Sequence, residues 1–398
     1  MTRPFASDPP GAAWSIGPVI DWLLREGRLE SDPLKLVGAL GARLTAAGAP
    51  LWRLRLGFFT IHPQVAAWAY VWVRGREPQI ERFPHGVRES GAFMGSPAQR
   101  MMQSGAPVRA RLDRLRASDH RVLHELAAEG GTDYALLPLR FADGSLNVFA
   151  VATDGPGGFG AADMEKFEQL SHALAAVLEA GVTHRIAQTL LDTYVGRRTG
   201  RRILAGQIQR GAAETIPAAL WYGDLRDFTR YTESLPAPRL LGMLNAYFEL
   251  VAKAVEPRGG EILRFMGDAM LIVFAAGREA EVAPACAAAV DAALDAFSRV
   301  ALLNRERVRA GEPEIRFGVG LTAGEVVYGN VGAPDRLDFT VIGPAVNRAA
   351  RLEALTKELG VPLLMAGEFA RCLGRPVRSR GSHRVKGLAE PIEVWELE

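Results

Sequence analysis

The chain has 398 residues, of which 48% are hydrophobic and 23% charged, as is typical of a soluble globular protein with two domains. Its formal net charge of +2 gives no electrostatic basis for binding nucleic acid or an anionic membrane surface. Cys286 and Cys372 are the only cysteines, too few for a disulfide framework or a zinc site, and they suit a reducing cytosol. The first residues lack a signal-peptide core and no window is apolar enough for a membrane span, so we expect a cytoplasmic protein.

The N-terminal half combines predicted helices and strands. Apolar residues with helical spacing predict helices at residues 19–29 and 33–47, and a longer helix at 162–191. Runs rich in aromatic and β-branched residues predict strands, two of them around a turn with hairpin chemistry. The expected strands are residues 51–61, 66–73, 134–142 and 146–153. Gly and Pro punctuate residues 84–107, which predicts a loop-rich stretch.

Four arginines surround the pair Thr199-Gly200 after the long predicted helix: Arg197, Arg198, Arg201 and Arg202. We interpret this segment as a solvated connector between two domains, because charged runs are usually exposed to solvent. A phosphate-binding patch is the alternative interpretation.

Asp224 follows an apolar run, residues 217–222, that predicts a β-strand. A turn and a helix come next, so the backbone N–H groups of Arg226 to Thr229 are expected to point toward a group beside this carboxylate. An Asp before a helix is also a common N-cap, so this segment alone does not predict a binding site.

Asp268 lies in a predicted hairpin. Residues 261–265 and 269–274 predict two antiparallel strands, and Gly267-Asp268 predicts the turn between them. Two carboxylates brought together at the ends of neighbouring strands can hold a pair of divalent cations, the usual apparatus for transferring a phosphoryl or nucleotidyl group.

Asn347 and Arg351 are four residues apart on a predicted helix that begins at Gly343-Pro344. An amide and a guanidinium on one helix face can orient a ribose and stabilise charge on a phosphate in the transition state. Lys386 lies beside Gly387 before the last predicted strand, where its ammonium group can reach a terminal phosphate. Taken singly, each of these residues is more typical of a solvated surface than of a binding site.

Together the four segments resemble, in their order, the catalytic domain of the class III nucleotide cyclases, the adenylyl and guanylyl cyclases. Residues 318–332 are similar to the central strand pair of that family, and the resemblance covers roughly residues 190–398. It implies an α/β (α+β) fold with a ferredoxin-like βαββαβ palm core.

The resemblance also implies a metal site and a dimer. Asp224, Asp268 and the backbone carbonyl of Leu225 match the family's ligands for two Mg²⁺ or Mn²⁺ ions per active site. Asn347 and Arg351 match the pair that acts on the transition state. In known members these two groups come from different subunits, so the resemblance implies a homodimer with active sites shared across the interface.

The remaining positions implied by the resemblance bind the nucleotide. Phe228 and Thr229 match the turn that cradles the triphosphate, and Lys386 matches the lysine that binds it. Arg264 and Thr340 lie where the family recognises the purine base.

Three positions depart from the usual family pattern. Arg264 replaces a Lys, and its planar fork of donors is not equivalent to an ammonium group. Thr340 stands where many adenylyl cyclases have Asp, and its hydroxyl both donates and accepts hydrogen bonds. Neither residue supplies the carboxylate that guanine favours, so ATP is the expected substrate and GTP the alternative. Asp227 replaces a Gly in the phosphate turn, and its effect on activity stays open.

Residues 134–180 resemble the end of a GAF-type sensory domain, in which a mixed sheet is combined with helices. We therefore expect a GAF-like regulatory domain at residues 19–182, a helical linker at 183–215 and the cyclase catalytic domain at 216–398. A small-molecule ligand of the first domain stays open, because no ligand motif stands out. His120 and His124, on a helix predicted at residues 119–128, are interpreted as surface histidines rather than as metal ligands.

The sequence thus predicts an adenylate cyclase that converts ATP to 3′,5′-cyclic AMP and pyrophosphate. Guanylate cyclase is the nearest alternative, and a weakly active or non-catalytic regulatory protein with a cyclase fold is another. A diguanylate cyclase is disfavoured, because the turn here is Gly267-Asp268 and not Gly259-Gly260-Glu261, and because that family has no counterpart to the helix of Asn347 and Arg351.

Overall fold

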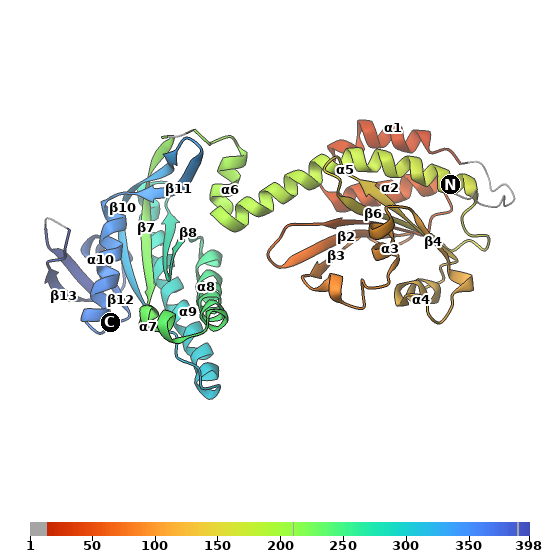
Figure 1. Ribbon diagram of the computed structural model, residues 1–398. Helices are drawn as coiled ribbons and strands as arrows, with labels where there is room; N and C mark the ends of the chain where they lie inside the picture. The colour runs from red at the N-terminus through yellow and green to blue at the C-terminus, as the bar shows by residue number, and fades with distance from the viewer. Residues whose placement is uncertain (1–13, 210, 388–389) are drawn as a thin grey trace. The chain divides into compact units, whose positions relative to one another are not determined.

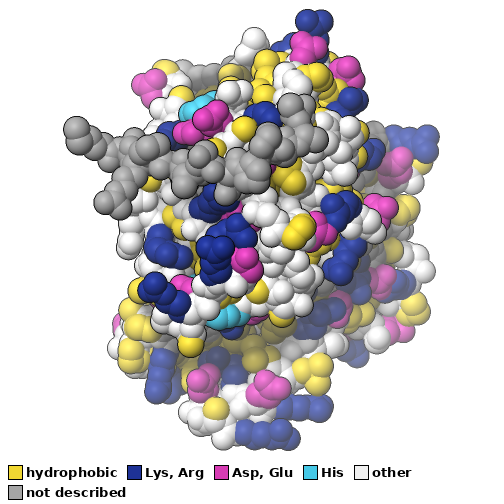
Figure 2. Space-filling view, turned by 90° about the vertical axis from the view of Figure 1, so that its right-hand side faces the viewer, with side chains coloured by type: hydrophobic (Ala, Val, Ile, Leu, Met, Phe, Trp, Pro, Cys, Tyr) yellow, Lys and Arg dark blue, Asp and Glu magenta, His cyan; other side chains and the backbone are white. Residues whose placement is uncertain are grey.

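The computed structural model describes residues 14–209, 211–387 and 390–398 (Figure 1). The chain divides into two compact units, with the boundary between Leu190 and Leu191 inside the long helix α5 (Ala161–Val195). Among the described residues, no helix is both long and apolar enough to cross a membrane. On the face shown in Figure 2, Lys and Arg side chains are interspersed with Asp and Glu, in agreement with the small net charge.

The first unit is built on a six-stranded sheet with the order β3-β2-β1-β6-β5-β4. Every pairing in it is antiparallel, where a mixed sheet was predicted. Its strands are β1 (Arg53–Phe59), β2 (Val65–Val73), β3 (Gln79–Pro84), β4 (Val108–Arg111), β5 (Asp133–Arg140) and β6 (Leu146–Thr153). The hairpin expected at residues 134–142 and 146–153 is present as β5 and β6.

Helices cover both faces of this sheet, because strands such as β2 and β6 are apolar at successive residues and their side chains alternate between the two faces. Phe149 and Val151 of β6 face a core closed by α1 (Gly17–Arg25), α2 (Pro33–Ala46) and α5. Val148 and Ala150 face a second core closed by α3 (Pro97–Ser104) and α4 (Arg121–Ala128). Short 3₁₀ turns are η1 (Gly27–Leu29), η2 (Val87–Glu89) and η3 (Leu112–Arg114).

Helix α3 lies inside the stretch that was predicted to be loop-rich. Its first turn is nevertheless well specified, because the Ser96 hydroxyl accepts a hydrogen bond from the Gln99 N–H at 3.1 Å and Pro97 occupies the first helical turn. This local start signal was missed because Gly and Pro dominate the surrounding segment.

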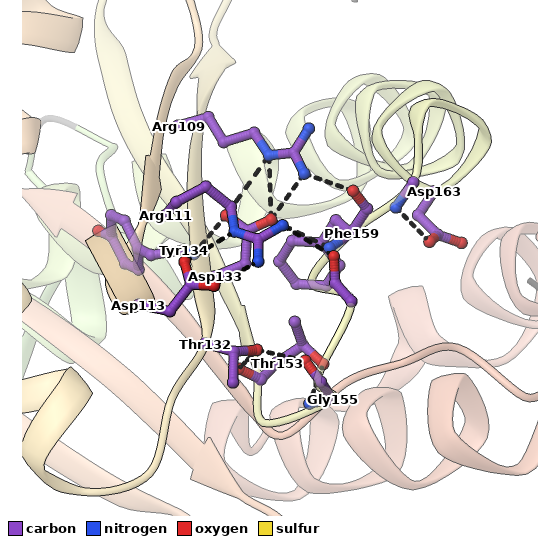
Figure 3. Close-up of polar contacts among 12 residues, drawn as sticks. Arg109, Arg111, Asp113, Thr132, Asp133, Tyr134, Thr153, Gly155, Phe159 and Asp163 are labelled. Atoms are coloured by element: carbon purple, nitrogen blue, oxygen red, sulfur yellow. Dashed lines mark hydrogen bonds and ion pairs between the residues drawn. The ribbon is translucent and has the colours of Figure 1, made fainter. Parts of the chain in front are cut away.

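A buried carboxylate fixes the loop from which α5 begins (Figure 3). Asp133 is fully buried on β5 and accepts hydrogen bonds from Arg109 at 2.6 Å and from the Phe159 N–H at 3.0 Å. Arg109 also donates to the Phe159 carbonyl, and Arg111 donates to the Gly157 carbonyl at 2.8 Å. The loop before α5 is therefore tied to strands β4 and β5.

The second unit contains an eight-stranded sheet with the order β13-β14-β12-β10-β7-β9-β8, and β11 pairs with the far half of β10. Its strands are β7 (Ala213–Leu225), β8 (Glu261–Met266), β9 (Ala269–Ala275), β10 (Phe317–Ala333), β11 (Arg336–Ile342), β12 (Leu363–Ala366), β13 (Val377–His383) and β14 (Ile392–Leu397). Counted from β7, the central order 4-1-3-2 with its intervening helices is the ferredoxin-like βαββαβ arrangement, which confirms the predicted palm core.

Helices lie on both faces of the second sheet (Figure 1). Trp221 of β7 faces the larger core, which α8 (Ala237–Val255), α9 (Val282–Arg309) and α11 (Gly367–Leu373) close. Leu220 faces the opposite core, which α10 (Pro344–Glu358) covers through Ala345 and Ala349. The shorter elements are α6 (Arg197–Leu204), α7 (Phe228–Ser234), η4 (Glu256–Arg258) and η5 (Glu279–Glu281).

The segment predicted as a solvated connector is the helix α6, and that prediction is wrong for its centre. Thr199 is fully buried, and its backbone N–H and hydroxyl lie within hydrogen-bond distance of the Glu261 carboxylate. The Tyr328 hydroxyl donates to the same carboxylate at 3.0 Å, and the Arg202 guanidinium lies 4.9 Å from the centre of the Tyr328 ring. Helix α6 is therefore packed against the sheet of the second unit.

Candidate active site

The register of the sheet brings Asp224 and Asp268 together. Gly223 of β7 pairs with Met270 of β9, so Asp224 follows this pair directly and Asp268 precedes it in the β8–β9 turn. The two carboxyl groups are within hydrogen-bond range of each other. The predicted hairpin at residues 261–274 is confirmed, and it places both acids at one edge of the sheet.

The electrostatics of this pair are unfavourable without a cation. Burial raises the pKa of Asp268 to about 7, and the hydrogen bond and the negative charge of Asp224 add to this rise. The Oδ1 atom of Asp224 is buried and has no hydrogen-bond partner. A buried oxygen without a donor, beside a second carboxylate, fits a divalent cation, which would satisfy both.

The donor set resembles a magnesium site that is completed by substrate. Among the described residues, no group of three or more His, Cys, Asp or Glu side chains is arranged to hold a metal ion. Mg²⁺ is commonly bound through one or two carboxylates together with substrate phosphates, so a two-carboxylate site suits a nucleotide-bound cation. Leu225, whose carbonyl is the other expected ligand, is the last residue of β7 and lies opposite Phe317.

The turn after Asp224 has a left-handed backbone at Asp227, with φ of 60°. Glycine favours this conformation, which explains why Gly suits the position, and Asp is among the residues that tolerate it best. The Asp227 carboxylate forms an ion pair with Arg316 at 2.8 Å. Phe228 then begins α7 and packs against the core, whereas Thr229 is exposed.

A third acid, which the sequence did not single out, lies near the aspartate pair. Glu353 of α10 forms an ion pair with Arg226 at 3.2 Å, and Arg226 also donates to the Thr356 hydroxyl. Burial raises the pKa of Glu353 to about 7; Arg226 opposes this rise, whereas the charges of Asp224 and Asp268 add to it. This contact attaches α10 to the strand that carries Asp224.

The two residues expected at the purine base lie on strands β8 and β11, which contact each other but do not pair. Arg264 of β8 forms an ion pair with Asp338 of β11. Thr340 is two residues beyond Asp338, so both side chains are on one face of β11. The structure thus brings Arg264 near Thr340. It also adds Asp338, which was not predicted from the sequence although it lies two residues before Thr340 on the same strand.

Asn347, Arg351 and Lys386 form another group. Asn347 and Arg351 are exposed on α10, and Lys386 is exposed in the connection between β13 and β14. A Cβ atom built on Gly387 would lie 3.6 Å from Nη2 of Arg351, so this connection lies beside Arg351. Within residues 14–209, 211–387 and 390–398, no hydrogen bond or ion pair joins this group to Asp224 or Asp268.

His120 and His124 serve local structure. His120 lies just before α4, and its Nδ1 accepts a hydrogen bond from the Val122 N–H at 3.2 Å. A ring nitrogen of His124 lies 3.1 Å from the Arg116 carbonyl. Neither belongs to a group of three or more potential metal ligands in the described part of the chain.

Two curated relatives illustrate the similarity to known proteins. Adenylate cyclase from Anabaena cylindrica is 35% identical over 199 residues, which cover 48% of this chain and 38% of that protein. Adenylate cyclase 1 from Rhizobium meliloti (strain 1021) is 32% identical over 211 residues, which cover 51% of this chain and 31% of that protein. The chain therefore matches less than half the length of either relative.

A solved structure of a bacterial light-regulated adenylyl cyclase is 28% identical, with a TM-score of 0.48, over 58% of this chain and 65% of that one. The family model of the adenylate and guanylate cyclase catalytic domain matches residues 212–398. This range contains the palm core, the aspartate pair, helix α10 and Lys386. Residues 212–398 of this chain are therefore an adenylate and guanylate cyclase catalytic domain.

Proposed function

We propose that this chain is an adenylate cyclase that converts ATP to 3′,5′-cyclic AMP and pyrophosphate. The observation that carries the proposal is the pair Asp224 and Asp268, with one buried oxygen that has no partner, at the sheet edge of a cyclase catalytic domain. The named adenylate cyclases among the relatives support ATP as the substrate.

Asp224, Asp268 and the Leu225 carbonyl would hold two Mg²⁺ or Mn²⁺ ions. When bound, these cations supply Lewis-acid activation of the ribose 3′-hydroxyl and neutralise charge on the phosphates. The negative charge of the aspartate pair is what attracts and retains them, and the raised pKa of Asp268 means that a cation must displace a proton near neutral pH.

The remaining side chains bind and orient the nucleotide. The backbone N–H groups of Phe228 and Thr229 and the ammonium of Lys386 hold the triphosphate. Asn347 orients the ribose, and Arg351 stabilises the charge that develops on the α-phosphate as its bond to pyrophosphate breaks. The exposure of Asn347, Arg351 and Lys386 leaves all three free to meet a substrate.

Base recognition falls to Arg264 and Thr340, with Asp338 as the partner that orients Arg264. Held in this way, the guanidinium presents donors to the acceptor nitrogens of adenine, and the Thr340 hydroxyl adds a donor and an acceptor. Guanylate cyclase is a second candidate because of one observation: the Asp338 carboxylate, if released from Arg264, would accept hydrogen bonds from guanine N1–H and its amino group.

We infer that the active site is completed by a second copy of the chain. In the part of the chain that the structure describes, no hydrogen bond or ion pair joins the aspartate pair to the group of Asn347, Arg351 and Lys386, and each alone lacks half of the chemistry. A two-fold homodimer would bring one group from each subunit into each of two equivalent sites.

We further infer that the first unit is a GAF-like regulatory domain at residues 19–182, joined through a helical linker at 183–215 to a catalytic domain at 216–398. The antiparallel sheet with helices on both faces supports the first assignment, and the match of the cyclase family model from residue 212 supports the last. Removing residues 1–185 should alter activity, dimerisation or regulation; a truncated chain indistinguishable from the full one in all three would contradict it.

The proposed function is tested by supplying the purified chain with Mg²⁺ or Mn²⁺ and either ATP or GTP and identifying the product by mass spectrometry. Cyclic AMP as the preferred product supports the proposal, and cyclic GMP supports the second candidate. A folded, dimeric chain that yields no cyclic product from either nucleotide would instead be a non-catalytic regulatory protein.

A further inference from the structure

A cavity of about 460 Å³ lies within the first unit, on the face of the sheet that α5 covers. Three parts of the chain line it: the segment from Gly27 to Val37, strands β1 and β2, and residues 177–188 of α5. Its size is within the usual range for sites that bind small organic molecules.

The floor of the cavity is apolar and partly aromatic. Leu56 and Phe58 of β1 and Trp68 of β2 line it, together with Leu36 of α2. All four side chains are buried. They offer a surface on which a ring or a short hydrocarbon body would lose contact with water, the main source of affinity for an apolar ligand.

One wall of the cavity is cationic. Arg185 of α5 is half-buried and donates a hydrogen bond to the Tyr70 hydroxyl at 2.7 Å. In the part of the chain that the structure describes, Arg185 has no carboxylate partner, although most buried guanidinium groups are paired with one. Arg28 and His184 also line the cavity.

Among the residues that line the cavity, Arg28 and Arg185 carry positive charge and Glu30 carries negative charge, so the lining is net positive. Glu30 is the one acidic residue that lines the cavity, and its carboxylate accepts a hydrogen bond from the Asp32 N–H at 2.8 Å. Asp32 is near Tyr70, but its side chain caps α2 by accepting from the Leu34 N–H. The cavity therefore combines an apolar floor with an excess of positive charge.

We propose that this cavity binds a small organic acid, with one carboxylate on Arg185 and an apolar body over Phe58 and Trp68. A carboxylate would supply the partner that Arg185 lacks, and the guanidinium fork matches its two oxygens. The apolar floor disfavours a free phosphate, which has no body to bury. This site is independent of the cyclase chemistry proposed above.

The occupant would contact α5 directly, because residues 177–188 of that helix form one side of the cavity. The same helix runs on to Val195, beyond the boundary between the two units. A bound acid would thus join the sheet of the first unit to the helix that leaves it.

The test uses the full-length chain and isothermal titration calorimetry with 2-naphthoate, an aromatic monocarboxylate, beside the neutral 2-naphthamide. We expect saturable binding of one naphthoate per chain, with the amide at least about tenfold weaker, since hydrogen bonds to charged groups contribute about 1.5–3 kcal/mol. Arg185→Gln should weaken naphthoate binding at least tenfold. Arg121→Gln, which removes an exposed arginine of α4, is the matched control and should leave binding unchanged.

A second variant fills the cavity without removing a contact. A Cβ atom at Gly181 would meet no atom within 4 Å, so Gly181→Leu extends into open space and also favours the helix. It should abolish naphthoate binding while the circular dichroism spectrum stays unchanged.

Three results would overturn the proposal. The first is that the wild-type chain binds no naphthoate, and the second is that Arg185→Gln and Gly181→Leu bind it as tightly as the wild type. The third is that the wild type binds 2-naphthoate and 2-naphthamide equally. If the wild-type chain binds no naphthoate and Gly181→Leu shifts the monomer–dimer equilibrium, the cavity is instead a contact site for a second copy of the chain.

Discussion

Two acids in this molecule, the fully buried Asp133 and the partly buried Asp224, have opposite surroundings. Asp133 in the first unit is fully buried and accepts hydrogen bonds from Arg109 and from two backbone N–H groups (Figure 3). Asp224 in the second unit has another acid, Asp268, as its neighbour, and one of its oxygens has no donor. The first carboxylate is satisfied by the protein itself, whereas the second is not.

The difference separates a structural acid from a functional one. A buried carboxylate that lacks donors destabilises the folded chain, so such an arrangement is expected where a ligand supplies the missing partner. We therefore expect substitutions at Asp133 and its partner to change stability, and substitutions at Asp224 and Asp268 to change cation binding and catalysis.

The largest expected effect follows Asp224→Asn. Cyclase turnover should fall by more than about 100-fold, since single electrostatic contacts to a transition state are typically worth 10²–10³-fold. The free energy of unfolding in the absence of cations should stay the same or rise, because a neighbouring pair of acids is removed. Turnover is measured by product formation and stability by urea unfolding; a variant that keeps wild-type turnover would show that Asp224 is not a metal ligand.

Arg109→Ala should have the reverse profile. Leaving Asp133 buried without its guanidinium partner should lower the free energy of unfolding of the first unit by about 3 kcal/mol. The matched control is Arg121→Ala, whose ion pair with Glu125 is exposed and should contribute less than about 0.5 kcal/mol. Equal destabilisation by the two variants in urea unfolding would mean that the Asp133 cluster has no special structural role.

A smaller effect tests the shared site. An Asp224→Ala chain mixed with an Arg351→Ala chain should recover about a quarter of wild-type turnover, because half of the dimers are mixed and each has one intact site. Neither variant alone should be active. Mixed chains that form heterodimers but stay inactive would contradict a site built from two subunits.

The smallest expected effect concerns the base. Asp338→Asn releases the Arg264 guanidinium from its ion pair and removes the carboxylate that holds it. The ratio of kcat/KM for ATP to that for GTP should change by a factor of about 10, because a hydrogen bond to a charged group typically contributes about 1.5–3 kcal/mol. Asp335→Asn, at an exposed acid just before β11, is the control. An unchanged ratio in Asp338→Asn would exclude Asp338 from base recognition.

Local sequence patterns were sufficient to predict the elements that present the candidate catalytic residues. An apolar run followed by a turn located Asp224, a hairpin turn located Asp268, and a Gly-Pro helix start located Asn347 and Arg351. Each of these signals lies within about ten residues of the side chain that it presents.

Contacts between distant segments were not predictable from such patterns. The burial of Thr199 depends on Glu261, which lies 62 residues further along the chain, and the pairing of Arg264 depends on Asp338. The left-handed backbone at Asp227 and the cavity beside Arg185 likewise arise only when separate elements pack together. Local propensity carries no information on such pairings.

The most direct test of the contrast between the two acids is Mn²⁺ binding, measured by electron paramagnetic resonance with 3′-deoxy-ATP, which lacks the attacking hydroxyl. The wild-type chain should bind two Mn²⁺ ions per active site. Asp268→Asn should lose at least one of them, whereas Asp133→Asn should bind as the wild type does. Unchanged Mn²⁺ binding in Asp268→Asn would contradict the assignment of the aspartate pair as the metal site.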